Sequence, residues 1–226
     1  MTLNQDQLKQ QVAEAAVEYI GQFFSTDAVI GVGTGSTADR FIDALAEHKD
    51  KFKGAVASSE RTAKRLEEHG IKVFDLNEID TMPVYVDGAD EVNPKLQMIK
   101  GGGGALTREK IVASVAERFV CIVDDSKWVE RLGSFNIPVE VIHMASNAVA
   151  NRLKSLGATE VIERADFITD NGHPILDAAG FQLEDAADLE RLINQIPGVV
   201  TCGLFAVVPA SVVLMASQDG VKTITV

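Results

Sequence analysis

The stretch from Asp87 to Lys110, DGADEVNPKLQMIKGGGGALTREK, contains the residues best suited to chemistry. Its first two acids, Asp87 and Asp90, follow the apolar run 82–86, which predicts a buried strand. Ligand groups in a parallel sheet gather just past the carboxyl ends of its strands, so we expect both acids to face a ligand. A turn with a helix cap is the simpler alternative for such a segment. Two small residues between the acids leave space for a substrate, Gly88 and Ala89.

A lysine and four consecutive glycines follow, at Lys100 and at 101–104. Glycine N–H groups have no side-chain cover and can converge on an oxyanion or a phosphate. Each glycine costs roughly 0.5–1 kcal/mol relative to alanine, which argues against the alternative of a flexible filler loop. A predicted helix starts near Leu106 and carries Glu109 in its N-terminal region. An acid there suits the helix dipole, and it can also project toward whatever the glycine loop binds.

A second glycine-rich turn lies near the N-terminus, where the predicted strand 28–30 leads into GVGTGST from Gly31 and then into a helix. The turn does not complete a dinucleotide-binding fingerprint, and it lacks the Gly-Lys-Ser/Thr ending of a Walker loop. It offers hydroxyls and backbone N–H groups at a helix start, a neutral donor set that suits a terminal phosphate monoester. Helix capping is the alternative role for these hydroxyls. The residues concerned are Thr34, Gly35, Ser36 and Thr37.

The amino-acid composition limits the classes of molecule that the protein is expected to bind. The formal net charge of −12 and the lack of basic clusters argue against nucleic acid and against an anionic membrane surface. A small phosphorylated ligand remains compatible, because distant surface charges are screened by salt. The two cysteines and four histidines show no metal-ligand or disulfide spacing. With a polar N-terminus and no apolar stretch of membrane-spanning length, we expect a cytoplasmic enzyme or regulator.

Predicted strands and helices alternate over residues 28–123, which favours an α/β fold with a doubly wound, mostly parallel, Rossmann-like sheet. Lys127 follows the strand 119–123 and is a candidate for the same crevice. The predicted strands are 28–30, 54–57, 72–76, 82–86 and 119–123, and the predicted helices are 6–24, 59–69, one from about 38 and one from about 106.

The pattern changes after Gly133. A strand at 138–142, a helix at 146–156, two short strands around the Asn-Gly turn in 167–176 and a helix at 186–196 predict an antiparallel α+β region. We therefore expect a Rossmann-like domain of residues 1–132 plus 204–226 and a small α+β domain of residues 133–203, which carries oligomer contacts. The runs 204–208, 212–216 and 221–226 are expected to return to the first sheet.

Three blocks, GVGTGSTA from Gly31, YVDGADEVN from Tyr85 and MIKGGGGALTREKI from Met98, resemble the A-type ribose-5-phosphate isomerases. Further likeness runs through FDLNEID, DDSK, PVEV, TDNG, IPGVVT and DGVKT, so the resemblance spans nearly the whole chain. It implies an aldose-ketose isomerase of the non-oxidative pentose phosphate pathway, acting on ribose 5-phosphate and ribulose 5-phosphate. Such an enzyme needs no metal or cofactor and is usually a homodimer.

The resemblance also implies roles for matching residues. Glu109 matches the family's proton-transferring base and Lys127 its second substrate lysine, while Lys9, with less distinctive flanking sequence, matches a lysine at the phosphate end. The remaining matches form three loops: a sugar-phosphate loop of Thr34, Gly35, Ser36 and Thr37, an acidic loop of Asp87, Gly88, Ala89 and Asp90, and a lysine-glycine loop of Lys100, Gly101, Gly102 and Gly103.

The implied reaction moves one proton between C2 and C1 of the sugar through an enediolate. Glu109 would transfer that proton, and Lys100 with the glycine amides would support the developing oxyanion. Asp87 and Asp90 would hold sugar hydroxyls and assist ring opening, and the sequence leaves the division between them open. A non-catalytic sugar-phosphate sensor is the main alternative, although the chain lacks the basic DNA-binding segment such a regulator would carry. An amino-sugar-phosphate deaminase is an analogy of fold alone.

Overall fold

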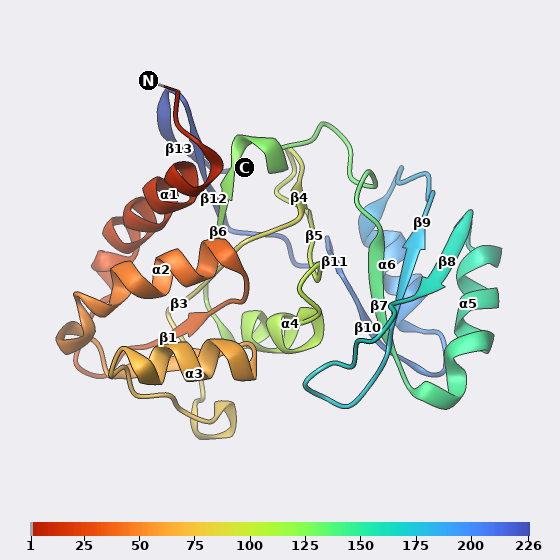
Figure 1. Ribbon diagram of the computed structural model, residues 1–226, viewed down its shortest axis with the longest axis horizontal. Coiled ribbons are helices and arrows are strands. Elements are labelled where there is room, and N and C mark those ends of the chain that lie inside the picture. Colours follow the sequence, from red (N-terminus) through yellow and green to blue (C-terminus); the bar gives the residue numbers. More distant parts are fainter. Residues whose placement is uncertain (1) are drawn as a thin grey trace. The chain divides into compact units, whose positions relative to one another are not determined.

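A computed structural model describes residues 2–226, which divide into two compact units (Figure 1). Unit 1 consists of residues 2–88, 108–128 and 210–226, and unit 2 consists of residues 89–107 and 129–209. This division differs from the boundaries expected from the sequence, because residues 89–107, 129–132 and 204–209 group with the smaller unit. The reason is local pairing, since two short strands within 89–107 hydrogen-bond to each other and to a third strand of unit 2.

Unit 1 is built on a six-stranded sheet of order β13-β12-β6-β3-β1-β2. Every neighbouring pair is parallel except β12 and β13. The central strands are buried along their whole length and are apolar except for the last residue of β3, Asp87, and of β6, Asp124, as expected of a parallel sheet covered on both faces. The predicted mostly parallel α/β sheet is confirmed. Its strands are β1 (Val29–Val32), β2 (Gly54–Ala57), β3 (Val84–Asp87), β6 (Phe119–Asp124), β12 (Val212–Ser217) and β13 (Gly220–Ile224).

The sheet of unit 1 has a topological switch point between β1 and β3. The chain passes from β1 to β2 on one side, and then returns to place β3 on the other side of β1. In such sheets ligands bind outside the carboxyl ends of the strands at the switch point. The segment 33–37 follows β1, and Gly88 follows Asp87, the last residue of β3, so two of the predicted site loops begin here.

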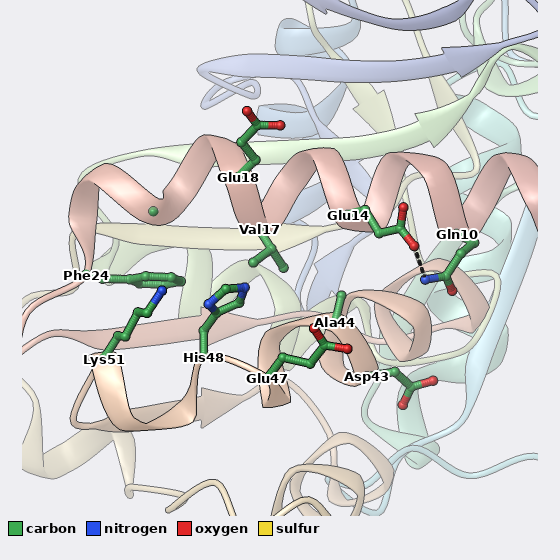
Figure 2. Close-up of a pocket in the computed structure, with 11 residues that line it drawn as sticks. Gln10, Glu14, Val17, Glu18, Phe24, Asp43, Ala44, Glu47, His48 and Lys51 are labelled. Carbon is green, nitrogen blue, oxygen red and sulfur yellow. Dashed lines mark hydrogen bonds between the residues drawn. The ribbon is translucent and has the colours of Figure 1, made fainter.

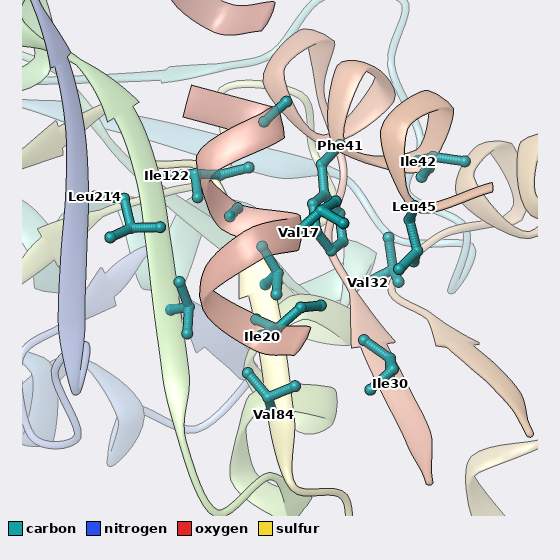
Figure 3. Packing of buried hydrophobic residues seen from close by; sticks show 14 of the residues in the cluster. Val17, Ile20, Ile30, Val32, Phe41, Ile42, Leu45, Val84, Ile122 and Leu214 are labelled. Atoms are coloured by element: carbon teal, nitrogen blue, oxygen red, sulfur yellow. The ribbon is translucent and has the colours of Figure 1, made fainter. Parts of the chain in front are cut away.

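Helices α1 (Gln5–Ile20) and α2 (Ser36–Ala46) pack on one face of this sheet. Figure 3 shows Val17 of α1 beside Phe41 of α2, and both belong to one apolar cluster with Ile122 of β6 and Leu214 of β12. Asn4 starts α1 with a reciprocal capping box to Gln7, which satisfies two backbone donors at the helix start. The other helices of the unit are α3 (Glu60–Glu68) and the part of α4 (Leu106–Val115) from residue 108 onward.

Unit 2 has an antiparallel sheet and a small three-stranded sheet, as the antiparallel α+β prediction requires. Apolar residues of the four-stranded sheet and of α5 and α6 form its core. The four-stranded sheet, of order β10-β7-β9-β8, contains β7 (Ile137–Val141), β8 (Glu160–Glu163), β9 (Ile175–Ala179) and β10 (Val199–Cys202). The three-stranded sheet contains β4 (Glu91–Val92), β5 (Met98–Ile99) and β11 (Leu204–Phe205), and the helices are α5 (Ser146–Ser155) and α6 (Ala186–Asn194).

Two predicted strands and one predicted sheet assignment are wrong. Residues 72–76 make only the single bridge Ala55↔Val73, because the Asp75 carboxylate accepts the N–H of Asn77 and turns the chain. The segment 167–169 is not a strand, and β9 pairs with β8 instead. The run 204–208 pairs with β5 of unit 2 over Leu204–Phe205 rather than joining the first sheet. The two later runs do join that sheet, as β12 and β13. Among residues 2–226, no helix combines the length and apolar character that a bilayer crossing requires.

Candidate active site

The carboxylate of Asp87 lies at the switch point of unit 1 and is fully buried. Its Oδ1 accepts the backbone N–H of Thr34 at 3.1 Å and that of Gly88 at 2.7 Å. Gly33 makes this approach possible, because a Cβ at that position would lie 1.9 Å from the Asp87 carboxyl carbon. The loop after β1 is therefore shaped around the carboxylate that ends β3.

Tyr85 precedes Asp87 by two residues in β3, so both side chains lie on the same face of the sheet. The Tyr85 hydroxyl donates to Asp87 Oδ2, and its ring packs against Phe119 with centroids 5.0 Å apart. Burial, followed by the negative charges of Asp87 and Glu109, raises the pKa of Tyr85 well above its usual value. Tyr85 is thus a neutral donor to a buried carboxylate. No role was predicted for Tyr85, although its i, i+2 spacing to Asp87 is visible in the sequence.

Glu109 lies in the first turn of α4 and is only 3% exposed. Its charge acts on Tyr85, which places Glu109 electrostatically in the same part of unit 1 as Asp87. In the same turn of α4, the Thr107 hydroxyl donates to the buried carboxylate of Glu140, a contact within unit 2. A carboxylate on a helix start is more rigidly held than one on a loop, as proton transfer to carbon requires.

The loop 34–37 leads into α2 through Gly35, whose φ of +128° is a conformation that side chains disfavour. Gly35 provides no capping side chain, so N–H groups of the first turn of α2 are available to an anion. Ser36 is exposed and Thr37 is half-buried. Neither hydroxyl forms a hydrogen bond within residues 2–226. These two hydroxyls and the helix start are therefore the donors that this end of the loop presents.

The Thr34 hydroxyl is instead held inside the protein. Its Oγ1 lies 2.8 Å from Ser58 Oγ, 2.9 Å from Ser59 Oγ and 3.1 Å from Thr62 Oγ1. Thr62 in turn donates to the backbone carbonyl of Gly33 at 2.8 Å. The expected donation of the Thr34 hydroxyl to a ligand is thus replaced by anchoring of the loop. No role in the site was predicted for Ser58, Ser59 or Thr62, although these residues follow β2, the neighbour of β1.

The two predicted substrate lysines of unit 1 lie on different elements. Lys127 ends a 3-10 turn, Asp125–Lys127, that follows β6, and Lys9 lies in α1. Both are half-buried, and neither forms an ion pair in the described part of the chain. Lys127 follows the carboxyl end of the strand beside β3, the edge at which Asp87 lies.

Unit 2 contains Ala89, Asp90, Lys100 and the four glycines. Asp90 Oδ2 accepts the N–H of Gly102 at 2.8 Å, so the second acid of the acidic loop binds the lysine-glycine loop. Lys100 is 2% exposed, its N–H donates to the carbonyl of Gly203 at 2.8 Å, and its ammonium lies 5.6 Å from the centre of the Phe205 ring. The buried lysine is therefore fixed at its backbone by the β5–β11 region.

A cavity of about 810 Å³ lies elsewhere in unit 1, between α1 and α2 (Figure 2). Its lining includes Glu14, Glu18, Phe24 and His48, and none of the predicted site residues. Among residues 2–226, no group of three or more histidine, cysteine or acidic residues is arranged to hold a metal ion. The cavity and the candidate chemistry are thus separate features of unit 1.

Residues 54–220 match the family model for ribose 5-phosphate isomerase A (phosphoriboisomerase A). Ribose-5-phosphate isomerase A of Bordetella bronchiseptica is 62% identical over 220 residues, covering 97% of each chain. The crystal structure of ribose 5-phosphate isomerase A from Neisseria gonorrhoeae superposes with a TM-score of 0.95 at 44% identity, covering 100% of this chain and 99% of that one. A D-ribose-5-phosphate isomerase in complex with phospho-erythronic acid gives a TM-score of 0.92 at 36% identity, covering 99% of this chain and 100% of that one.

Sequence blocks, fold and overall similarity agree across both units. The chain therefore belongs to the ribose 5-phosphate isomerase A family.

Proposed function

We propose that this protein interconverts ribose 5-phosphate and ribulose 5-phosphate. Family membership over nearly the whole chain supports the substrate and the reaction. The observation in the structure that carries the proposal is the group of Asp87, Glu109 and neutral Tyr85, buried together in unit 1, where Asp87 ends a strand beside an uncapped helix start. A proton-transferring carboxylate and an anion-binding turn are the two parts an aldose phosphate isomerase needs.

The phosphate group is assigned to the loop 34–37. Ser36, Thr37 and the first N–H groups of α2 provide the donors, and the one acid of that turn, Asp39, is paired with Arg61. Lys9 and Lys127 provide positive charge for the phosphate and the sugar. Thr34 acts by holding the loop through its internal hydroxyl contacts.

Glu109 is the proposed base. It removes the proton from C2 of the open-chain aldose and returns it to C1, while hydroxyl protons are redistributed between O1 and O2. The enediolate between these steps carries negative charge on oxygen. Lys100 and the N–H groups of the lysine-glycine loop are the proposed electrophiles for that charge. All atoms balance without a cofactor or metal.

Asp87 and Asp90 are proposed to bind sugar hydroxyls and to assist opening of the furanose ring, with Gly88 and Ala89 leaving space for the sugar. The complex of a related isomerase with phospho-erythronic acid supports a phosphorylated sugar as the substrate. In that compound the carboxylate stands in for the two oxygens of the enediolate. We further propose a homodimer located in the cytoplasm.

The experiment is to incubate purified protein with ribose 5-phosphate and to measure the appearance of the ketose. Arabinose 5-phosphate and glucosamine 6-phosphate serve as controls, because conversion of the amino sugar with ammonia release would identify a deaminase. We expect ketose from ribose 5-phosphate. Binding of ribose 5-phosphate without turnover would instead indicate a sensor and overturn the proposal.

A further inference from the structure

Arg164 follows the end of β8 in unit 2, and its guanidinium joins two parts of that unit. Nε and Nη2 bind the two carboxylate oxygens of Asp177 at 2.9 and 2.6 Å. Nη1 donates to the backbone carbonyls of Gly101 and Gly102, at 3.2 Å each. Asp177 fixes the plane of the guanidinium, because a bidentate pair leaves it little freedom to rotate. The remaining nitrogen is therefore held against the lysine-glycine loop.

The peptide group between Gly101 and Gly102 is held on both sides. Its carbonyl accepts from Arg164, and its N–H donates to Asp90 Oδ2 at 2.8 Å. The C=O and N–H of a trans peptide point in opposite directions, so these two contacts fix the orientation of the peptide plane. Glycine has the greatest freedom of backbone rotation, so such a run depends on outside contacts to hold one conformation.

The carbonyl of the next peptide group, between Gly102 and Gly103, accepts a hydrogen bond from the same Arg164 nitrogen, Nη1. Its N–H, which belongs to Gly103, consequently points away from Arg164. Gly103 is exposed, and no other atom lies within 4 Å of the place a Cβ would take. A guanidinium on the carbonyl oxygen also polarises the peptide, which makes the N–H a stronger donor. This N–H is thus oriented, polarised and accessible.

The far end of the loop is packed by the same region of unit 2. A Cβ on Gly104 would lie 2.1 Å from the ring of Phe167, and that ring lies 5.4 Å from the Arg164 guanidinium carbon. The side chain of Arg164 is 18% exposed. Arg164 therefore contacts an acid, an aromatic ring and two backbone carbonyls. An arginine that served only as a solvent-exposed surface charge would not need these partners.

We propose that Arg164 is a positioning residue for the isomerisation, which orients and polarises the Gly102–Gly103 peptide so that its N–H stabilises the enediolate oxyanion. This inference rests on the proposed function. Arg164 does not touch the substrate. Its effect belongs to the transition state, because the ground-state sugar carries no negative charge at C1 or C2.

The test compares Arg164→Met with Arg152→Met, which removes an exposed arginine from α5 of the same unit. Removing an oxyanion donor outright costs about 10²–10³-fold in kcat, so loss of its positioning should cost about 10- to 100-fold. We expect that loss in Arg164→Met, with KM for ribose 5-phosphate changed less than about threefold, and wild-type constants in Arg152→Met. Wild-type kcat in Arg164→Met, or an effect confined to KM, would overturn the inference.

A binding measurement separates this inference from the proposed function. Affinity for phospho-erythronic acid should fall in Arg164→Met in parallel with kcat, while affinity for inorganic phosphate stays at the wild-type value. Equal losses for both probes would indicate a general structural defect and overturn the positioning role. Failure of the wild-type protein to isomerise ribose 5-phosphate would overturn the proposed function, whereas an active wild type with a fully active Arg164→Met would overturn only this inference.

Arg164→Lys provides the second variant if Arg164→Met does not fold, as judged by circular dichroism. A lysine keeps the charge, but its single ammonium cannot hold Asp177 and both glycine carbonyls in one plane. A fall in kcat of about fivefold or more at unchanged KM supports the inference, and wild-type kcat contradicts it.

Discussion

The Tyr85 hydroxyl donates a hydrogen bond to the carboxylate of Asp87, and both residues are fully buried at the end of β3. The second oxygen of that carboxylate accepts the N–H groups of Thr34 and Gly88. These three donors, a phenol and two backbone amides, are neutral groups. Orientation, rather than charge compensation, is what these neighbours provide.

Tyr85 should remain protonated in the folded protein far above pH 10. The chain has two tyrosines, so Tyr19→Phe leaves Tyr85 as the only one. We expect its absorbance at 295 nm to show no phenolate until the protein unfolds, because burial and the charges of Asp87 and Glu109 raise its pKa. Ionisation near pH 10 with the fold intact, followed by circular dichroism, would contradict this.

The same shift predicts how stability depends on alkaline pH. Above about pH 10 the unfolded state releases the Tyr85 proton and the folded state keeps it, so the unfolded state binds fewer protons. The free energy of unfolding should therefore fall as pH rises above 10, and this part of the dependence should be absent in Tyr85→Phe. Urea unfolding at pH 9, 10 and 11 measures the difference between the two proteins.

Thr62→Val should loosen the loop that follows β1. Thr62 is 1% exposed and donates to the carbonyl of Gly33, so the substitution keeps its shape and leaves that buried acceptor unpaired. We expect a loss of about 1–3 kcal/mol in the free energy of unfolding and a raised KM for ribose 5-phosphate. Thr223→Val, at an exposed position of β13, is the control and should change neither. An unchanged stability in Thr62→Val would show that the hydroxyl contacts are not structural.

Elements with strong local signals were predictable from the sequence. Apolar runs predicted β1, β2, β3 and β6, because strands of a parallel sheet that is buried on both faces consist of such runs. Apolar residues at helical spacing predicted α1 and α3. The short strands β4 and β8 had no such signal. β4 has only two residues and β8, with the sequence EVIE, is mostly exposed, so both depend on pairing with partners elsewhere in the chain. The predicted strand 72–76 failed because the Asp75 turn competes with pairing.

The candidate site residues stand out in the sequence where they occupy turns at strand or helix ends. The contacts that hold these residues were not. Arg164 is 62 residues from Gly102 in sequence, and nothing in its neighbourhood indicates a glycine carbonyl as its partner. The anchoring of Thr34 by three hydroxyls likewise depends on the packing of β1 against β2, which brings together residues that are 24 to 28 positions apart.

Thr37→Ala should weaken capture of the phosphorylated substrate. A hydrogen bond to a charged group contributes roughly 1.5–3 kcal/mol, so kcat/KM for ribose 5-phosphate should fall about 10- to 100-fold. Unphosphorylated ribose has no group for Thr37 to bind, and its efficiency should not change. Equal losses for the two sugars would remove Thr37 from the phosphate site.

Activity should survive exhaustive chelation. The proposed reaction needs only proton transfer and oxyanion support, and both are assigned to side chains and backbone N–H groups. Rates measured with and without excess EDTA should agree. A large loss that a divalent ion restores would show that a metal takes part.

Glu109→Gln provides the test of the base. The substitution keeps shape and removes basicity, and loss of a general base costs about 10²–10⁴-fold, so kcat should fall by that order. Substrate affinity, which depends on phosphate and hydroxyl contacts, should change little. Asp87→Asn and Asp90→Asn are the matched comparisons, because these acids are the rivals for the role.

For these three variants, exchange of the C2 proton of ribose 5-phosphate with deuterated solvent is a more direct measurement than kcat. It reports proton abstraction even when turnover is too slow to follow. Exchange should be lost in Glu109→Gln and should persist in at least one of the two Asp→Asn variants. Wild-type exchange in Glu109→Gln, together with its loss in Asp87→Asn or Asp90→Asn, would move the base to the acidic loop. Glu109 would then be left with a structural role at the start of α4, where a buried carboxylate also suits the helix dipole.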